Sequence, residues 1–259
     1  LTSKNAEDFI KLLNISSSLN LRVFRLGSDF VPFASHESFK KEWIKEVENI
    51  ILDIKPKVRS FNIRITMHPG QFVVLNSPNQ KVIDSSLREL EYHFWLLDLL
   101  GLCNNSVVVI HLGGQYGNKK ESIERFIKTI RANKWLTQRL VVENDEKNYA
   151  VADLFSVAEE GIGIVFDYYH HSLNPSSFEP ADIIKSWGGR RPEFHLSSKP
   201  KGPHRFGEHG DWITLEDFLS MKKMFQHYDY DIIIEAKKKE LAIIRLLNQL
   251  ESIETELNI

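Results

Sequence analysis

Short runs of aliphatic and β-branched residues recur along the chain, and longer segments with helical spacing lie between them. Apolar runs of this length are typical of parallel strands that are buried on both faces. Their alternation with helices predicts βαβ units and a parallel sheet. The seven predicted strands are 21–27, 64–68, 106–112, 139–144, 162–168, 193–197 and 231–236.

The segments between these strands carry apolar residues three and four positions apart, as amphipathic helices do. Ser86 with Glu89 fits a capping box that would start the third helix near Ser86, and Thr214 with Asp217 fits another cap. The stretch 198–212 is polar and rich in Gly, Pro and His, so we expect a functional loop there. The six predicted helices are 6–19, 40–54, 82–100, 122–133, 151–160 and 215–228.

This alternation over 259 residues predicts one α/β domain, 1–259, of the (β/α)8 TIM-barrel class. A closed barrel of this class has eight strands, and the sequence supplies seven. We therefore expect that the first strand is missing ahead of the first helix, or that the barrel is open at that position.

Composition narrows the class of protein. Hydrophobic residues make up 42% of the chain and charged residues 26%, as in ordinary globular proteins. We find no apolar run of eighteen residues and no signal or transit sequence, and Cys103 is the single cysteine. These features predict a cytoplasmic monomer with no membrane partner, nucleoid-associated if the source is a prokaryote. The net charge of −2 argues mildly against a polyanionic partner, although bound cations and local basic residues can make one face positive.

Six consecutive predicted strands carry a metal-binding residue type at or near their carboxyl ends. In a parallel barrel these ends build the active site, so we expect the side chains to meet there. The residues are His68, His111, Glu143, Asp167 with His170, His195, and Glu235.

One such residue alone is best interpreted as a core histidine or an ion-paired carboxylate. Many together would cost many kcal/mol in desolvation and repulsion unless cations neutralised them. Imidazoles and carboxylates suit Zn²⁺, Mn²⁺ or Fe²⁺, which activate water and bind the oxygens of a phosphodiester. Phosphoryl transfer is the favoured chemistry, and sugar isomerisation on a two-metal barrel is the chief alternative.

Eight segments, in order and over nearly the whole chain, resemble motifs of the UV damage endonuclease family, which is itself similar to the endonuclease IV barrels. Strings such as HPGQ, HLGG and VENDE in series make the resemblance specific. The segments are FRLGSDFVPFASH from Phe24, MHPGQF from Met67, VVIHLGGQYGNK from Val108, VVENDEKNY from Val141, FDYYHHSLNP from Phe166, FHLSS from Phe194, HGDWI from His209 and IIIEAKKKE from Ile232.

The resemblance implies a site for two or three divalent ions, with Mn²⁺ expected first and Zn²⁺, Fe²⁺ or Co²⁺ as alternatives. The implied ligands of the first ion are His68, His111 and Glu143. Those of the second ion are the bridging Glu143, Asp167, His195 and Glu235. Those of the third ion are His170 and His209, with His204 as the alternative to His209.

The sequence departs from the family pattern at three places. The family carries a carboxylated lysine two residues before the sixth-strand histidine, whereas this chain has Glu193. Glu193 either supplies the same charge directly or is a surface residue without a role. The lesion-probing pair after HPG is Gln-Tyr in the family and Gln71 with Phe72 here, so the stacking face is kept. The Gly-Tyr motif of the family's first strand is not found.

Other residues are candidates for DNA contact. Tyr116, after the HLGG turn, either contacts the substrate or packs within its loop. Several basic side chains near the predicted site either bind phosphates or form a solvated face. These are Lys199, Lys201, Arg205, Lys237 and Lys239. The residues expected to carry the chemistry are Glu143, Glu235, His209, Glu193 and Lys237.

These observations predict a metal-dependent DNA repair endonuclease. The resemblance implies hydrolysis of double-stranded DNA on the 5′ side of cyclobutane dimers and 6-4 photoproducts, with abasic sites as a wider range of lesions. The alternatives are an abasic-site endonuclease of the endonuclease IV type, a two-metal sugar isomerase or epimerase, and a lesion-binding module without catalysis.

Overall fold

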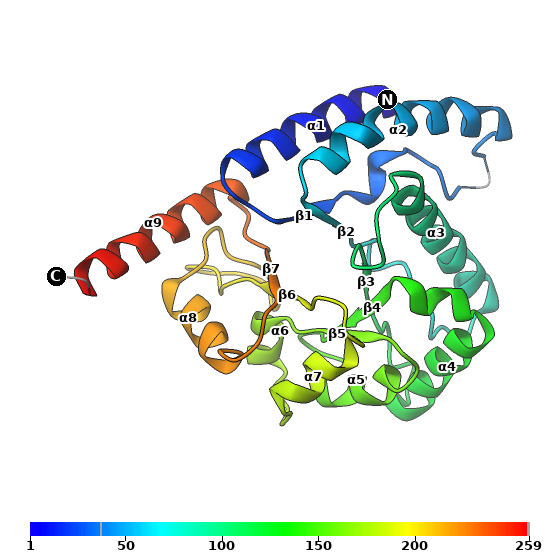
Figure 1. Ribbon diagram of the computed structural model, residues 1–259. Coiled ribbons are helices and arrows are strands. Elements are labelled where there is room, and N and C mark those ends of the chain that lie inside the picture. The colour runs from blue at the N-terminus through cyan, green and yellow to red at the C-terminus, as the bar shows by residue number, and fades with distance from the viewer. Residues whose placement is uncertain (37, 258–259) are drawn as a thin grey trace. The chain divides into compact units, whose positions relative to one another are not determined.

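The structure, a computed structural model, describes residues 1–36 and 38–257. Within these residues seven strands alternate with helices, as the hydrophobic pattern predicts (Figure 1). Each strand lies inside its predicted range. The strands are β1 (Val23–Leu26), β2 (Arg64–Met67), β3 (Val108–His111), β4 (Leu140–Glu143), β5 (Gly163–Val165), β6 (Glu193–Leu196) and β7 (Asp231–Ile234).

Strands β1 to β5 form one sheet in chain order, and β6 and β7 form a second sheet of two strands. The pair β1 and β2 and the pair β6 and β7 are both parallel, with Glu193 opposite Asp231 in the latter. The backbone N–H of His195 donates to the carbonyl of Phe166 at 2.9 Å, so β6 also lies beside the continuation of β5. Parallel pairing places the carboxyl ends of neighbouring strands at the same edge.

All six helices that the spacing predicts are present. They are α1 (Thr2–Ser18), α2 (Lys41–Ser60), α3 (Gln80–Leu99), α4 (Lys119–Ala132), α5 (Val151–Ala158) and α8 (Leu215–Met224). Unpredicted are α6 (Tyr168–Leu173), α7 (Pro180–Ser186), α9 (Glu240–Leu257) and the 3-10 helices η1 (Ser28–Phe30) and η2 (Lys134–Gln138). Helices α6 and α7 have six and seven residues, too few to show a helical period. Among the described residues, no helix combines the length and apolar character needed to cross a bilayer.

The two predicted helix caps have different outcomes. Thr214 is the N-cap of α8, and its hydroxyl accepts from the N–H of Asp217, as predicted. The capping box at Ser86 is wrong, because α3 begins earlier, after the N-cap Asn79. Ser86 lies inside the helix, where its hydroxyl accepts from the N–H of Val74 at 2.8 Å. The serine therefore anchors the preceding loop instead of starting the helix.

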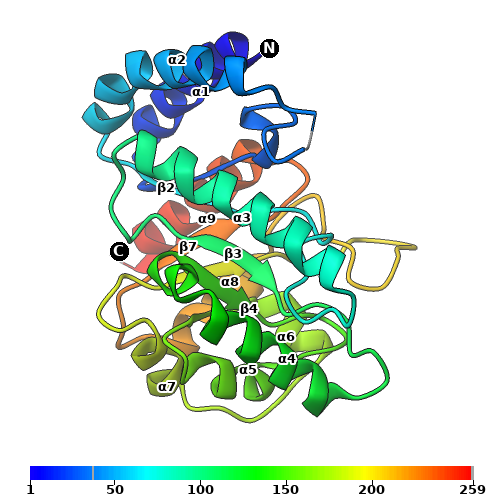
Figure 2. The same ribbon diagram turned by 90° about the vertical axis from the view of Figure 1, so that its right-hand side faces the viewer.

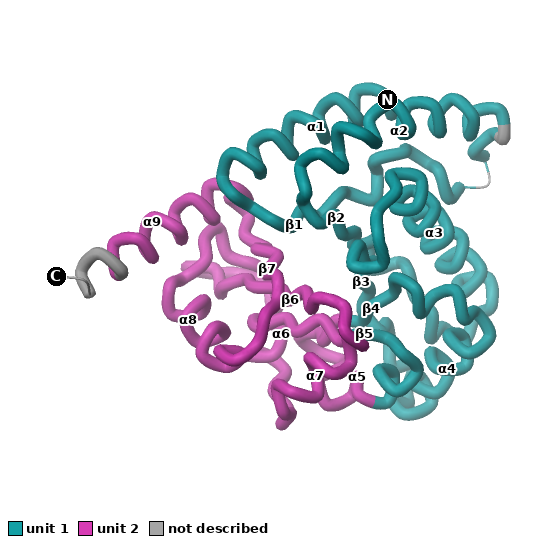
Figure 3. Tube along the Cα trace, in the orientation of Figure 1, with its two compact units in different colours: residues 1–142, 156–163 teal, residues 143–155, 164–259 magenta. Residues whose placement is uncertain are grey.

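The chain divides into two compact units, shown in different colours in Figure 3. Unit 1 comprises 1–142 and 156–163, and unit 2 comprises 143–155 and 164–259. In unit 1, α1 and α2 pack side by side, as Figure 1 and Figure 2 both show. Its fully buried side chains include Ile65 and Met67 of β2.

An aromatic core organises unit 2. The ring centroid of Phe194 lies 4.6 Å from that of Phe225 and 4.8 Å from that of Tyr230. Successive side chains of a strand point to opposite faces of the sheet. The packing of Phe194 into this core therefore directs its neighbours Glu193 and His195 to the other face.

The cap of α8 yields a stability prediction. Thr214→Ala should lower the free energy of unfolding by about 1 kcal/mol, because the helix loses a side-chain acceptor for one of its first N–H groups. Thr214→Ser, which keeps the hydroxyl, should be nearly neutral. Urea denaturation followed by circular dichroism measures both. An equal loss in the two variants would assign the effect to the threonine methyl group and not to the cap.

Candidate metal centre

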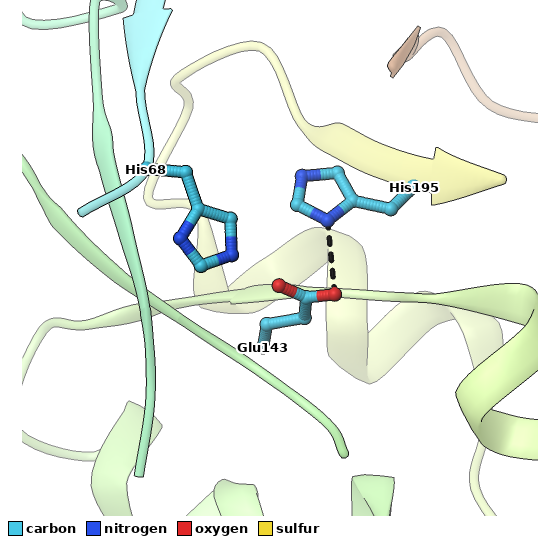
Figure 4. A group of neighbouring side chains, drawn as sticks. All are labelled: His68, Glu143 and His195. Carbon is cyan, nitrogen blue, oxygen red and sulfur yellow. Dashed lines mark ion pairs between the residues drawn. The ribbon is translucent and has the colours of Figure 1, made fainter. Parts of the chain in front are cut away.

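His195, on β6, is fully buried among carboxylates of unit 2. Its Nδ1 lies 2.9 Å from Oε1 of Glu143 and 3.4 Å from Oε1 of Glu235, and its Nε2 lies 3.4 Å from Oε1 of Glu193. Figure 4 shows a ring nitrogen of His195 directed at the Glu143 carboxylate; the third residue labelled there, His68, belongs to unit 1. A neutral imidazole carries one N–H, so one nitrogen can donate while the other binds a metal.

Asp167 and His170 are placed by one short helix. Asp167 follows β5 and is the N-cap of α6, where its Oδ1 accepts from the N–H of His170 at 2.6 Å. The His170 ring then folds back, with Nδ1 3.7 Å from the same carboxylate oxygen and 3.4 Å from Oε1 of Glu143. The Asp-x-x-His spacing thus sets both the cap and the position of the ring.

Asn144, a buried residue directly after β4, connects the ends of two strands. Its amide donates to the carbonyl of Asp167 at 3.0 Å, and its side-chain oxygen accepts from the N–H of Asp167 at 2.9 Å. Its own backbone carbonyl accepts from Nδ1 of His170 at 3.1 Å. Asn144 therefore holds two predicted ligands. The sequence does not reveal this role, because nothing in the hydrophobic pattern separates Asn144 from an ordinary loop residue.

The structure distinguishes between the two candidate histidines of the long loop. Nδ1 of His209 lies 3.4 Å from Oε2 of Glu235, and its ring centroid lies 5.7 Å from that of His170. The next residue, Gly210, donates its N–H to the carbonyl of Ser198 at 2.7 Å. His204 is exposed and faces a carbonyl of its own turn. His209 is therefore the one of the two that lies beside the predicted ligands.

Unit 1 contributes a separate pair of imidazoles. His68 directly follows β2, and His111 is the last residue of β3. Their ring centroids lie 5.3 Å apart. The Ser28 hydroxyl donates to the carbonyl of His68 at 3.3 Å and lies 3.0 Å from Nε2 of the buried His93. Burial lowers the pKa of His93, so this ring is neutral at physiological pH. Ser28 and His93 thus anchor the backbone of His68, a role that the sequence analysis did not assign.

The centre of unit 2 carries strongly shifted pKa values. Burial raises the pKa of Asp167 to about 7, with Glu143 adding to the shift and His170 opposing it. Burial lowers the pKa of His170, but the carboxylates of Asp167 and Glu143 outweigh this effect and raise it to about 11. A proton on His170 can therefore balance buried negative charge. A bound cation would take over this charge and release the proton.

Two groups of side chains in unit 2 bring their ligand atoms within 4.8 Å of one another. The first group is Glu143, Asp167 and His170, and the second is Asp167, His195 and Glu235. Oδ2 of Asp167 is buried and accepts no hydrogen bond from any residue that the structure describes. A buried carboxylate oxygen beside imidazoles suits a first-row divalent ion. The residues present therefore fit the expected metal ions.

Glu193 and the basic residues occupy different environments. Glu193 is fully buried, so its interpretation as a surface glutamate is wrong. The basic candidates are exposed, and Lys237 forms an ion pair with Glu208. The exposed candidates are Lys199, Lys201, Arg205, Lys237 and Lys239.

Two aromatic residues follow the same local pattern in the loops after β2 and β3. Segment 70–72 reads Gly-Gln-Phe and segment 114–116 reads Gly-Gln-Tyr. Phe72 is 69% exposed and Tyr116 is 47% exposed, so neither side chain packs in the core. A Cβ atom on the glycine would lie 2.6 Å from the Phe72 ring in the first segment and 3.2 Å from the Tyr116 ring in the second. Each aromatic ring therefore packs against the glycine two residues before it.

Polar contacts within unit 1 join these two loops. The Asn76 amide donates to the carbonyl of Gly114 at 2.8 Å, and Nε of Arg125 donates to the carbonyl of Asn76 at 2.9 Å. The Arg125 guanidinium lies 5.7 Å from the centre of the Tyr116 ring. Tyr116 has a φ of 47°, which residues other than glycine rarely adopt. The contact with Arg125 and the backbone conformation at Tyr116 thus hold the exposed ring in place.

Comparison with known proteins agrees with the motifs. The sequence profile of the family described as UV-endonuclease UvdE matches residues 1–258. The UV DNA damage endonuclease of Bacillus cereus (strain Q1) is 33% identical over 267 residues, which cover 98% of this chain and 83% of that protein. The protein of the same name from Bacillus velezensis is 32% identical over 264 residues, which cover 98% and 82%.

Solved structures support the fold. The crystal structure of SacUVDE matches with a TM-score of 0.88 and 33% identity, covering 98% of this chain and 88% of that chain. D-psicose 3-epimerase from Clostridium cellulolyticum H10 matches with a TM-score of 0.58 at 11% identity, covering 88% and 80%. A xylose isomerase domain protein from Planctomyces limnophilus matches with a TM-score of 0.60 at 14% identity, covering 92% and 90%. The last two share the fold alone, and the predicted TIM-barrel class is confirmed.

The hydrogen bonds of Asn144 yield a prediction about metal binding. Asn144→Ala should weaken Mn²⁺ binding about 10- to 100-fold, the usual effect of removing a group that orients metal ligands. Calorimetric titration of the chelator-treated protein with Mn²⁺ measures this. Asn118→Ala, which removes an exposed cap of α4, is the matched control and should bind as the wild type does. Unchanged affinity in Asn144→Ala would show that Asp167 and His170 keep their positions without it.

Proposed function

Because the chain belongs to the UV-endonuclease UvdE family, we propose that it hydrolyses the phosphodiester of double-stranded DNA on the 5′ side of UV photoproducts. The proposed lesions are cyclobutane dimers and 6-4 photoproducts. Abasic sites would extend the range of lesions that the enzyme cuts. The observation that carries the proposal is the buried group of carboxylates and imidazoles around Asp167, in a chain 33% identical to a UV DNA damage endonuclease over 98% of its length.

The side chains of unit 2 are proposed to hold two divalent ions, Mn²⁺ first among the candidates. Asp167, His195 and Glu235, with Glu143 beside them, would hold one ion, and His170 with His209 would hold another. The paired imidazoles of His68 and His111 would hold a further ion. Such ions supply Lewis-acid chemistry that activates water and stabilises charge on the phosphoryl group.

Glu193 is proposed to act through His195, in the place where the family resemblance puts a carboxylated lysine. Its carboxylate lies 3.4 Å from Nε2 of His195 and would accept from this nitrogen, while Nδ1 lies beside Glu143 and Glu235. Carboxylates that orient metal-bound imidazoles in this way also make the ring a stronger ligand. Glu193 would thus supply its negative charge to the centre directly, without modification of a lysine.

Gln71 and Phe72 are proposed to recognise the damage. A photodimer has lost stacking and pairing, so extruding its bases costs less than flipping intact ones. The space left in the duplex must be filled, and an exposed ring resting on a glycine can enter it. Phe72 would stack in the gap, Gln71 would bond the orphaned bases, and Tyr116 would offer a second ring.

The exposed basic residues are proposed to contact phosphates. Charged contacts of this kind provide affinity that does not depend on sequence. Lys237 is already paired with Glu208, so its contact with DNA would compete with this ion pair. The group comprises Lys199, Lys201, Arg205, Lys237 and Lys239.

One assay tests the function. The purified protein is incubated with Mn²⁺ and a duplex that contains a single thymine dimer, beside an undamaged duplex, an abasic duplex and an aldose. We expect incision directly 5′ to the dimer and none in the undamaged duplex. Incision at abasic sites only, conversion of the aldose to a ketose, or binding without turnover would each contradict the proposal and support a different class.

The first variant prediction concerns Glu143, whose Oε1 lies within 3.4 Å of both His170 and His195. Glu143→Ala should reduce incision by more than about a hundredfold and lower the metal content. This loss is larger than the one usually seen for residues that orient a metal ligand without binding the metal themselves. Elemental analysis and the incision rate measure the two effects. Glu216→Ala, at an exposed position of α8, is the control. A variant with full metal content and a normal rate would show that the ligand assignment is wrong.

The second variant prediction concerns Phe72. Phe72→Ala should weaken the preference for damaged over intact duplex by about tenfold, because a stacked aromatic contributes about 1–3 kcal/mol and about 1.4 kcal/mol is a factor of ten. Phe72→Tyr, which keeps the stacking face, should be nearly neutral. Both affinities are measured at one fixed salt concentration, because phosphate contacts depend on salt. If Phe72→Ala keeps the wild-type preference and metal content, the wedge lies elsewhere.

A further inference from the structure

The orientation of the His170 ring determines which nitrogen can bind a metal. Nδ1 lies 3.1 Å from the backbone carbonyl of Asn144, and a carbonyl oxygen only accepts. The hydrogen of the neutral ring therefore sits on Nδ1, and the lone pair sits on Nε2. Nε2 lies 3.9 Å from Oε2 of Glu146. Nε2, the nitrogen that we expect to bind a metal, thus faces a carboxylate to which the sequence motifs give no role.

Local structure fixes the backbone around Glu146. The preceding residue, Asp145, accepts from the backbone N–H groups of Lys147, Asn148 and Tyr149 through its Oδ1. These bonds form a tight turn. The turn begins directly after Asn144, which itself follows the predicted ligand Glu143. The Glu146 side chain is 29% exposed, so it is accessible to an ion and partly shielded from water.

The long loop covers the Glu146 side chain from another direction. A Cβ atom added to Gly207 would lie 2.9 Å from Cγ of Glu146, and Gly207 has a φ of +76°. Two residues later the same loop presents His209, whose ring centroid lies 5.7 Å from that of His170. The loop therefore brings a second imidazole to the histidine that Glu146 faces, and the missing side chain of Gly207 leaves room for the carboxylate.

We propose that Glu146 supplies a carboxylate ligand to the ion held by His170 and His209. The inference rests on the metal centre of the proposed function and extends its ligand set. Two atoms that each lie about 2.1 Å from one ion can be at most about 4.2 Å apart, so the 3.9 Å between Nε2 of His170 and Oε2 of Glu146 fits a shared ion. Two imidazoles and one carboxylate are a donor set that Mn²⁺ or Zn²⁺ accepts.

The test measures ion binding in the absence of DNA. The wild-type chain, Glu146→Gln and the control Glu159→Gln, at an exposed position, are dialysed against graded Mn²⁺, and bound manganese is counted. We expect Glu146→Gln to weaken one class of ion at least tenfold and to leave the others unchanged. In the double variant Glu146→Gln with His170→Gln, the affinity for that class of ion should fall no further than in His170→Gln alone, because both residues act on one ion.

Two further results make the test decisive. Glu146→Asp keeps the charge on a shorter arm and should weaken the same class of ion by a smaller factor, which a purely structural role would not predict. Wild-type affinities for all ions in both Glu146→Gln and Glu146→Asp would overturn the inference. Incision of a dimer duplex by the wild type is scored separately. If the wild type binds the ions without incision, the proposed function fails, whereas unchanged ion binding in the Glu146 variants of an incising protein refutes this inference alone.

Discussion

Burial of negative charge is the constraint on which the rest of the centre depends. Glu143, Asp167 and Glu193 are almost completely inaccessible to water and lie around His195. Carboxylates in such surroundings resist ionisation unless positive charge and hydrogen bonds compensate them. The aromatic core packs on the opposite face of β6. The polar strand ends therefore need positive charge beside them, which protonated imidazoles or bound cations can supply.

Much of this arrangement could be predicted from the sequence. The strand ranges could be predicted because buried parallel strands leave continuous apolar runs, and the gathering of the strand-end side chains follows from the shared edge of such a sheet. Asn144 and Glu146 could not be assigned in the same way, since their roles arise from a turn whose geometry the pattern of apolar residues does not record. The error at Ser86 has a related origin, because a capping spacing inside a helix looks like one at its start.

The two units carry different parts of the proposed activity. Unit 2 contains the carboxylates and most of the imidazoles, and its geometry is set by hydrogen bonds between strand ends. Unit 1 contains the exposed rings of Phe72 and Tyr116, whose loops Asn76 and Arg125 join. The proposed chemistry would thus depend on the neutralisation of buried charge, and the proposed recognition on solvent-exposed aromatic surface of unit 1.

The glycines beneath the two exposed rings have a consequence for how such proteins diverge. The orientation of Phe72 depends on an atom that Gly70 lacks, since a Cβ there would collide with the ring. On the proposed role of Phe72, selection on DNA recognition would therefore act at Gly70 as well as at the ring. A larger residue at Gly70 would displace the Phe72 ring, and on the proposed role of Phe72 this displacement would weaken the preference for damaged DNA. The smallest side chain in the loop would thereby tune the preference for damaged DNA through the ring that it supports.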